Sequence, residues 1–178
     1  MKNKYFLGDL SFGDTFSTEN LGKFMVFEKK ELCVVVCSVG GIGVNMQYNN
    51  ALISTYEGSN IDNYCNKELL SKFEKEFGKE NILEHLYSHT DATVSEGLVQ
   101  KESIFKVRLI GLGEYRKYQE TTNNVLKNDI WLNSTNNNME SFYMSKYGKL
   151  NSDKVYNCKD IMVICHLSNS TIVEKVKG

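Results

Sequence analysis

The stretch that decides the fold is "CVVVCSVGGIGVNMQ", residues 33–47, in which a β-branched run leads into three glycines. A strand that enters a glycine-rich turn is typical of phosphate-binding loops in α/β domains. A dinucleotide fingerprint, however, needs the order G-x-G-x-x-G and a helix directly after it. Here the order is G-G-x-G, the following "VNMQYNNALIST" has no helical period, and no P-loop lysine follows the glycines. The loop is therefore predicted to be a turn between strands, not a nucleotide site.

Upstream of this turn, the chain is rich in Val, Phe and Thr, which favour strands. The runs are "GDTF" (13–16), "GKFMVFE" (22–28) and "ELCVVVCSV" (31–39), with the charged "EKKE" (28–31) fitting a hairpin turn between the last two. "ALIST" (51–55) is predicted to add another strand.

Downstream, the hydrophobic period changes from two to about four residues. Apolar side chains recur at Ile61, Cys65, Leu69, Phe73 and Phe77. Ser59 and Asp62 fit a capping box, and Gly78 stands where a helix C-terminal cap belongs. These signals predict a helix over 60–77, and "ENILEHLYS" (80–88) is predicted to form a second, short helix.

The C-terminal half returns to strand patterns after "GEYRKYQE" (113–120), which fits one or two helical turns. The predicted strands lie in "IFKVRLIGL" (104–112), "DIWLNS" (129–134), "ESFYMSKYGKL" (140–150) and "DIMVICHLS" (160–168). The "KYG" at 146–148 has the glycine of a hairpin turn. The order of strands, central helices and further strands predicts an α+β fold with a mainly antiparallel sheet, one long helix and one or two short ones.

Composition places the chain among globular proteins, with 178 residues and 41% hydrophobic content. That length predicts a single domain over residues 1–178. No apolar run approaches the roughly 18 residues of a membrane span, and no secretory signal pattern is present, so we expect a cytoplasmic protein without a membrane partner. The five cysteines are expected to be reduced thiols, because they form no CxxC pair.

Charge is distributed unevenly along the chain. Residues 57–102 carry ten acids against five lysines, a net charge of −5, whereas residues 103–178 carry eleven bases against seven acids, a net charge of +4. Only two of the bases are arginines, so we expect weak or no direct binding to nucleic acid. The acidic stretch is either a solvated face or a surface that docks on a basic partner through Glu74, Glu76, Glu80 and Glu84.

Two constellations could carry chemistry or ligand binding. His85 and His89 at i, i+4, with Asp91 beyond, could share a helix face and bind zinc, but no third ligand at a diagnostic spacing follows. We therefore predict no metal, no cofactor and no catalytic residue, and a zinc enzyme ranks last among the functions considered. Trp131 is the single tryptophan. It is either a core residue or, with the residues Asn133, Asn136 and Tyr143, the anchor of a ligand site.

The order of several motifs resembles an uncharacterised family found in prophages and mobile elements of Gram-positive anaerobes. "GEYRKYQ" (113–119) followed by "WLNST" (131–135) is the most specific part, and "GDTF" and "SKYGKL" also fit. One tryptophan of the family's pair is missing here, and "VICHL" (163–167) replaces its closing G-V-R-P. The last portion of the pattern is also similar to C-type-lectin-like folds.

The resemblance implies a genetic setting and no established reaction. It leads us to expect an accessory protein of a phage or mobile element that acts as a non-enzymatic protein-binding module. The partner would be a host protein, and the most specific version is an inhibitor of a host defence nuclease, as an anti-CRISPR protein is. The alternative is a lectin-like domain that binds a glycan or peptide at the Trp131 loop.

Overall fold

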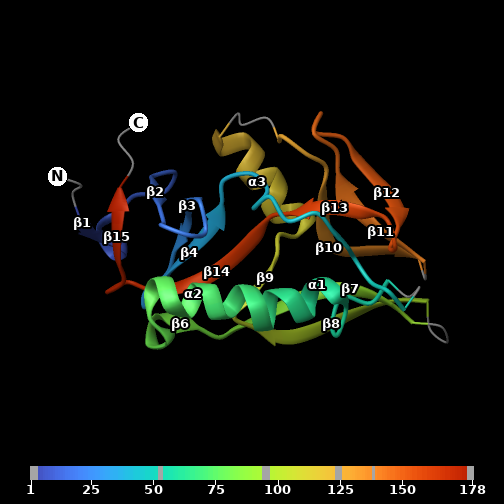
Figure 1. Cartoon of the computed structure of the whole chain (residues 1–178), viewed down its shortest axis with the longest axis horizontal. Coiled ribbons are helices and arrows are strands. Elements are labelled where there is room, and N and C mark those ends of the chain that lie inside the picture. The colour runs from blue at the N-terminus through green and yellow to red at the C-terminus, as the bar shows by residue number, and fades with distance from the viewer. Residues whose placement is uncertain (1–3, 52–53, 94–96, 123–125, 138, 176–178) are drawn as a thin grey trace.

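The computed structural model describes residues 4–51, 54–93, 97–122, 126–137 and 139–175. The chain has the predicted α+β fold, in which antiparallel strands predominate and one long helix crosses the molecule (Figure 1). A 3-10 turn, η1 (Leu7–Asp9), follows the first strand.

The central sheet is antiparallel and contains eight strands among the described residues. Its order is β1 (Lys4–Phe6), β15 (Ile172–Lys175), β2 (Thr15–Ser17), β3 (Lys23–Lys29), β4 (Cys33–Ser38), β14 (Val163–Ser168) and β6 (Ile82–Leu83), and β9 (Val107–Leu109) also pairs with β14. One edge of β14 pairs with β4, and β9 and β6 share the other edge. The strands predicted at 13–16, 22–28 and 31–39 are confirmed as β2, β3 and β4.

Both faces of the central strands are covered, which explains why β4 and β14 read as nearly continuous apolar runs. Val34 and Val36 of β4 belong to a core on the side of the long helix, whereas Val35 and Cys37 belong to a second core on the side of α3 (Leu112–Thr122). In Figure 1, β14 runs between the two helices. Alternation along each strand therefore distributes side chains between two cores.

The predicted helix over 60–77 is confirmed, and it contains an irregular turn. It consists of α1 (Asn60–Asn63), the π-helical turn η2 (Tyr64–Leu69) and α2 (Leu70–Phe77). The Ser59 hydroxyl accepts a hydrogen bond from the Asp62 N–H at 3.1 Å, as the capping box predicted. Gly78 ends the helix at φ +84°, and its N–H donates to the carbonyl of Glu74. A positive φ costs glycine little, so this position favours it.

A second, smaller sheet packs beside the first. Its order is β12 (Leu150–Lys154), β11 (Glu140–Met144), β10 (Ile130–Asn137), β13 (Cys158–Ile161) and β5 (Met46–Gln47). β10 and β13 are parallel, and the other pairs are antiparallel. The hairpin predicted around Gly148 is confirmed: it joins β11 to β12, and the Gly148 N–H donates to the carbonyl of Ser145 at 2.8 Å.

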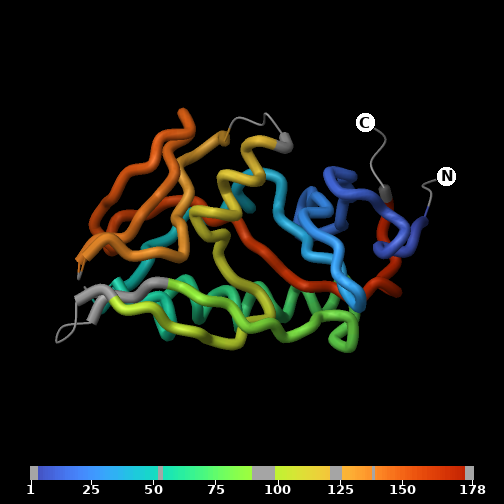
Figure 2. The backbone as a smooth tube through the Cα atoms, turned by 180° about the vertical axis from the view of Figure 1, so that it is seen from behind, coloured from blue at the N-terminus to red at the C-terminus, as the bar shows by residue number. Residues whose placement is uncertain are grey.

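The predicted helix at 80–88 is wrong. A 3-10 turn, η3 (Lys79–Asn81), leads into β6, and β7 (His85–Thr93) then pairs with β8 (Gly97–Phe105) as a two-stranded ribbon. Figure 2 shows the ribbon running along the long helix. The four-residue spacing of His85 and His89 also places both residues on one face of a strand, so the spacing did not distinguish helix from strand.

The predicted strand at 51–55 is not formed by its described residues. Ala51, Ser54 and Thr55 lie outside any strand, and residues 52–53 lie outside the described part of the chain. The predicted turns at 113–120 are confirmed as part of α3, which is longer than expected.

Candidate functional site

The β7–β8 ribbon presents two chemically different faces. His85 pairs with Phe105, Leu86 with Ile104, and Ser88 with Glu102 across its two strands. Because successive side chains of a strand alternate, His85, Tyr87 and His89 point to one face, the inner face, and Leu86 and Ser88 to the other, the outer face. Among the side chains whose burial is described, His85 and His89 of the inner face are buried, whereas Leu86, Ser88, Glu102 and Ile104 of the outer face are exposed.

The inner face contains a buried charged cluster around Arg108 of β9. Its guanidinium makes two hydrogen bonds to the Glu114 carboxylate, at 2.8 and 2.6 Å, and its Nε donates to His85 Nε2 at 3.0 Å. The same guanidinium lies 3.4 Å from the ring centroid of Tyr87. Glu114 also accepts the Gly111 N–H at 2.9 Å. The donors and acceptors of this cluster thus hydrogen-bond mainly to one another. These bonds connect the ribbon to β9 and α3.

Two histidines stack at the edge of this cluster. The rings of His85 and His166 are parallel within 11°, with centroids 3.8 Å apart. Burial, together with nearby positive charge that includes Arg108, lowers the pKa of both to about 3. Since Arg108 donates to His85 Nε2, that atom carries no proton, and neither imidazole is charged at neutral pH.

The outer face contains an exposed apolar pair between acidic residues. Leu86 and Ile104 lie directly opposite each other and are 63% and 66% exposed. On one side of the pair, Glu84 forms a 3.8 Å ion pair with Lys106, and on the other side Glu102 is exposed opposite Ser88. An apolar centre with a charged rim is the usual composition of a protein interface.

The structure does not gather the four predicted glutamates on one face. Glu74 and Glu76 are two residues apart on α2 and therefore point about 200° apart around the helix axis. Glu76 is engaged within the chain, because its carboxylate accepts the Glu19 N–H at 2.9 Å. Glu80 and Glu84 follow the helix, in η3 and before β7. Of the four, only Glu84 borders the apolar pair of the ribbon.

Two of the four residues of the predicted Trp131 ligand site are buried, and Asn136 and Tyr143 are half-buried. Trp131 and Asn133 are fully buried, and the Trp131 indole N–H donates to the carbonyl of Met46 at 3.1 Å. Tyr143 lies opposite Trp131 on β11, with ring centroids 6.2 Å apart, and Asn136 donates to Glu140 at the far end of β10. Trp131 is therefore a core residue, the interpretation that the sequence left open beside ligand binding.

The structure places the two histidines of the candidate zinc constellation on β7. His85 and His89 do share a strand face, but the Asp91 side chain lies outside the described residues. Among the side chains that are described, no three of His, Cys, Asp and Glu come together. The thiols of Cys33, Cys37, Cys65 and Cys165 are buried, and burial raises the pKa of each.

The glycine loop binds a carboxylate of the chain itself. Oδ1 of Asp160 accepts the N–H groups of Gly43 and Val44 at 3.0 and 3.1 Å, and Asn128 donates to Oδ2 at 3.2 Å. The predicted turn between strands is confirmed, since the loop connects β4 to β5. Its anion-binding amides are occupied by Asp160 and do not face a ligand.

Sequence reasoning missed Arg108, Tyr87 and the exposed Leu86–Ile104 pair. A period-2 analysis of "HLYSHTD" (85–91) would have placed Leu86 and His85 on opposite faces of a strand. No local signal identifies Arg108 as buried, because its partners come from other elements.

No helix in the described part of the chain is long and apolar enough to span a membrane. Neither a protein-family model, nor a curated protein, nor a solved structure matches the chain.

Proposed function

We propose that this chain is a non-enzymatic protein-binding module that docks through the outer face of the β7–β8 ribbon. The observation that carries the proposal is the cross-strand pair of Leu86 and Ile104, each about two-thirds exposed, near the end of the ribbon where β7 begins and β8 ends. Exposed apolar groups that are surrounded by polar ones are typical of interaction sites. Burying this pair against a partner would contribute a few kcal/mol, at about 25 cal/mol per Å² of apolar area.

Charge indicates the kind of partner. Glu84 and Glu102 flank the apolar pair, and the stretch 57–102 that forms the helix and most of the ribbon has a net charge of −5. Complementary charge accelerates association and excludes partners of the same sign. A basic protein surface with an apolar depression fits this face best.

The resemblance to the prophage family supports a more specific version. In that setting the partner is a host protein in the cytoplasm of the bacterium, and a nucleic-acid-processing defence nuclease offers the required basic surface. The module would then inhibit by occupying the channel that binds DNA or guide RNA, as an anti-CRISPR protein does. This version specifies the target of the module. It can be refuted without refuting the proposal that the ribbon is the docking surface.

The test compares two exposed apolar pairs on the same chain. The ribbon variant is Leu86→Ser/Ile104→Ser. The matched control is Phe6→Ser/Ile172→Ser, because these two residues also form an exposed cross-strand pair, between β1 and β15, at 53% and 57% exposure. Tagged wild type and both variants, checked for equal thermal stability, are used for affinity purification from a nuclease-treated lysate of the host.

We expect one stoichiometric protein to be recovered with wild type and with the control variant, and to be lost with the ribbon variant. Charge reversal by Glu84→Lys/Glu102→Lys should also weaken binding, more strongly at low salt, whereas Glu31→Lys in the β3–β4 turn should not. A partner that the ribbon variant retains would show that the surface is wrongly assigned. A partner other than a nucleic-acid-processing protein would refute only the inhibitor version.

A further inference from the structure

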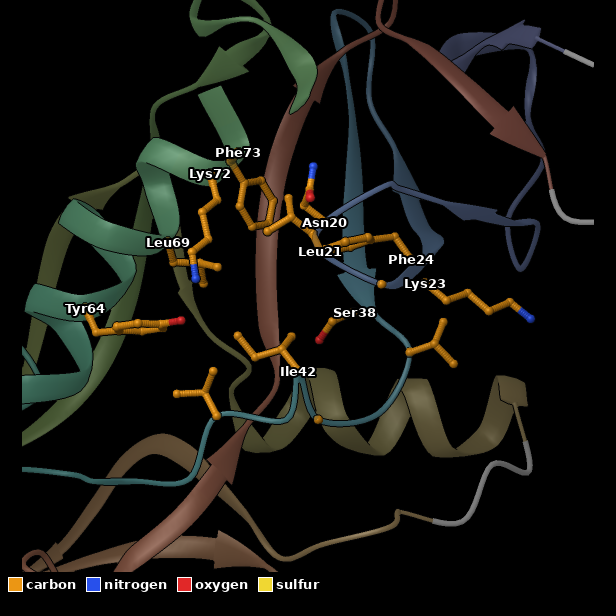
Figure 3. Close-up of a pocket in the computed structure, with 14 residues that line it drawn as sticks. Asn20, Leu21, Lys23, Phe24, Ser38, Ile42, Tyr64, Leu69, Lys72 and Phe73 are labelled. Carbon is orange, nitrogen blue, oxygen red and sulfur yellow. The ribbon is translucent and has the colours of Figure 1, made fainter. Parts of the chain in front are cut away.

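A cavity of about 210 Å³ opens between the long helix, the turn before β3 and the glycine loop (Figure 3). Its apolar wall includes Phe24 of β3, Ile42 of the loop, and Leu69 and Phe73 of the helix. The volume corresponds to about seven water molecules at ~30 Å³ each, which is less than drug-sized ligands need. The cavity can therefore hold a compact molecule that has both an apolar and a polar part.

Two polar groups of the helix line the cavity beside the apolar wall. Tyr64 extends into the cavity with its hydroxyl foremost, and Lys72 extends along the same wall (Figure 3). Among the described residues, no carboxylate lies within 4 Å of the Lys72 ammonium, and no hydrogen bond engages the Tyr64 hydroxyl. A cation and a hydroxyl donor are thus available to an acceptor group of a ligand.

The irregular turn of the helix creates this arrangement. Tyr64 and Leu69 are the first and last residues of the π-helical turn, and both line the cavity. In a regular α-helix, residues five apart point about 140° apart, whereas the wider π turn brings them towards one face. Single π turns inside α-helices occur frequently at functional sites, and here the turn borders the cavity.

The opposite wall is held in place by the Asp160 carboxylate. Its bonds to the N–H groups of Gly43 and Val44 fix the loop that supplies Ile42 and Val44 to the cavity. Because those amides are already bonded, the loop offers apolar side chains and not phosphate-binding N–H groups. Ser38 is engaged too, since its hydroxyl donates to Gly40 and accepts from Val163. The chemistry favours an apolar acid over a phosphate.

We propose that this cavity binds a compact organic carboxylate. The hydrocarbon part contacts Phe24, Ile42 and Phe73, and the carboxylate accepts hydrogen bonds from the Lys72 ammonium and the Tyr64 hydroxyl. The site is separate from the outer face of the ribbon, so it does not depend on the protein-binding proposal.

Titration of the full chain with hexanoate and with phenylacetate, followed by NMR chemical shifts and calorimetry, tests this site. At least one acid should bind saturably with a Kd at or below about 1 mM, as the size of such ligands allows. Shifts should map to the helix and the glycine loop. Hexanamide, which lacks the charge, and inorganic phosphate should bind at least about tenfold more weakly.

Variants at exposed or half-exposed positions locate the carboxylate. Lys72→Met should weaken binding of the acid about tenfold or more, the loss expected for one charge-assisted hydrogen bond. Tyr64→Phe should weaken it severalfold without changing the packing, whereas Lys75→Met, on the same helix but outside the cavity lining, should have no effect.

Three results would overturn the inference. They are the absence of saturable binding of both acids up to about 10 mM, equal affinity for phosphate, and an affinity that Lys72→Met leaves unchanged.

Discussion

Asp160 shows, at the scale of single residues, how a glycine motif can serve the fold instead of a ligand. Its carboxylate lies among the amides of the glycine loop and accepts the Gly43 N–H from 117 positions away in sequence. Gly41 has no space for a side chain, because a Cβ there would collide with the same carboxylate. The glycines could be recognised from sequence as a turn, but their anion could not be identified, since nothing near residue 41 indicates Asp160.

Gly41→Ala should therefore destabilise the protein, by about 1–3 kcal/mol, the typical cost of forcing extra atoms into a packed site. Gly113→Ala is the matched control, because no atom lies within 4 Å of a Cβ there and the residue is helical. Urea unfolding followed by circular dichroism measures both. A Gly41→Ala protein as stable as Gly113→Ala would contradict the steric role assigned to Asp160.

Individual elements differ in how far the chain's local sequence specifies them. The long helix was predictable because Ser59, Gly78 and the apolar period all act within a few residues. β7 was not, because its histidine spacing fits a helix as well as a strand, and pairing with β8 decides between them. The elements are then tied together by Arg108, which joins β9 to Glu114 of α3 and to His85 of β7.

Arg108→Met should cost about 3–5 kcal/mol of unfolding free energy, because it leaves Glu114 and His85 without their buried partner. Glu114→Gln keeps an acceptor for the Gly111 N–H and removes the charge. The double variant Arg108→Met/Glu114→Gln should lose less unfolding free energy than the two single variants lose together, because the two residues interact directly. Strictly additive costs in a double-mutant cycle by urea unfolding would argue against a coupled pair.

The whole molecule is organised by a sheet covered on both faces. One core contains side chains from both ends of the chain, among them Leu7 and Val173. The second core lies between the sheet and α3. His85 and His166 lie where the ribbon meets β14, so their protonation acts on the global stability of the chain.

Stability should fall as the pH is lowered from about 6.5. The folded chain lowers the pKa of His85 and His166 from 6.5 to about 3, so between these values the unfolded chain binds more protons. The stabilising contribution is complete above pH 6.5 and is lost progressively towards pH 3, with a slope of up to about 1.4 kcal/mol per pH unit for each histidine.

Urea unfolding at pH 7 and pH 5 measures this loss. His166→Phe keeps a ring stacked on His85 but removes one titrating group, so its pH dependence should be smaller than that of the wild type. If the variant and the wild type lost the same unfolding free energy between pH 7 and pH 5, His166 would be excluded as a source of the pH dependence.

The sequence by itself determined the α+β class, the limits and caps of the long helix, the hairpin at Gly148 and the turn character of the glycine loop. These features depend on residues close together in the chain, whose patterns act locally. Tertiary structure alone decided that Trp131 is buried, that His85 lies on a strand beside Arg108, and that Leu86 and Ile104 are exposed together. Each of these depends on partners from distant segments, and burial or pairing between such segments is settled only when the sheets and helices pack.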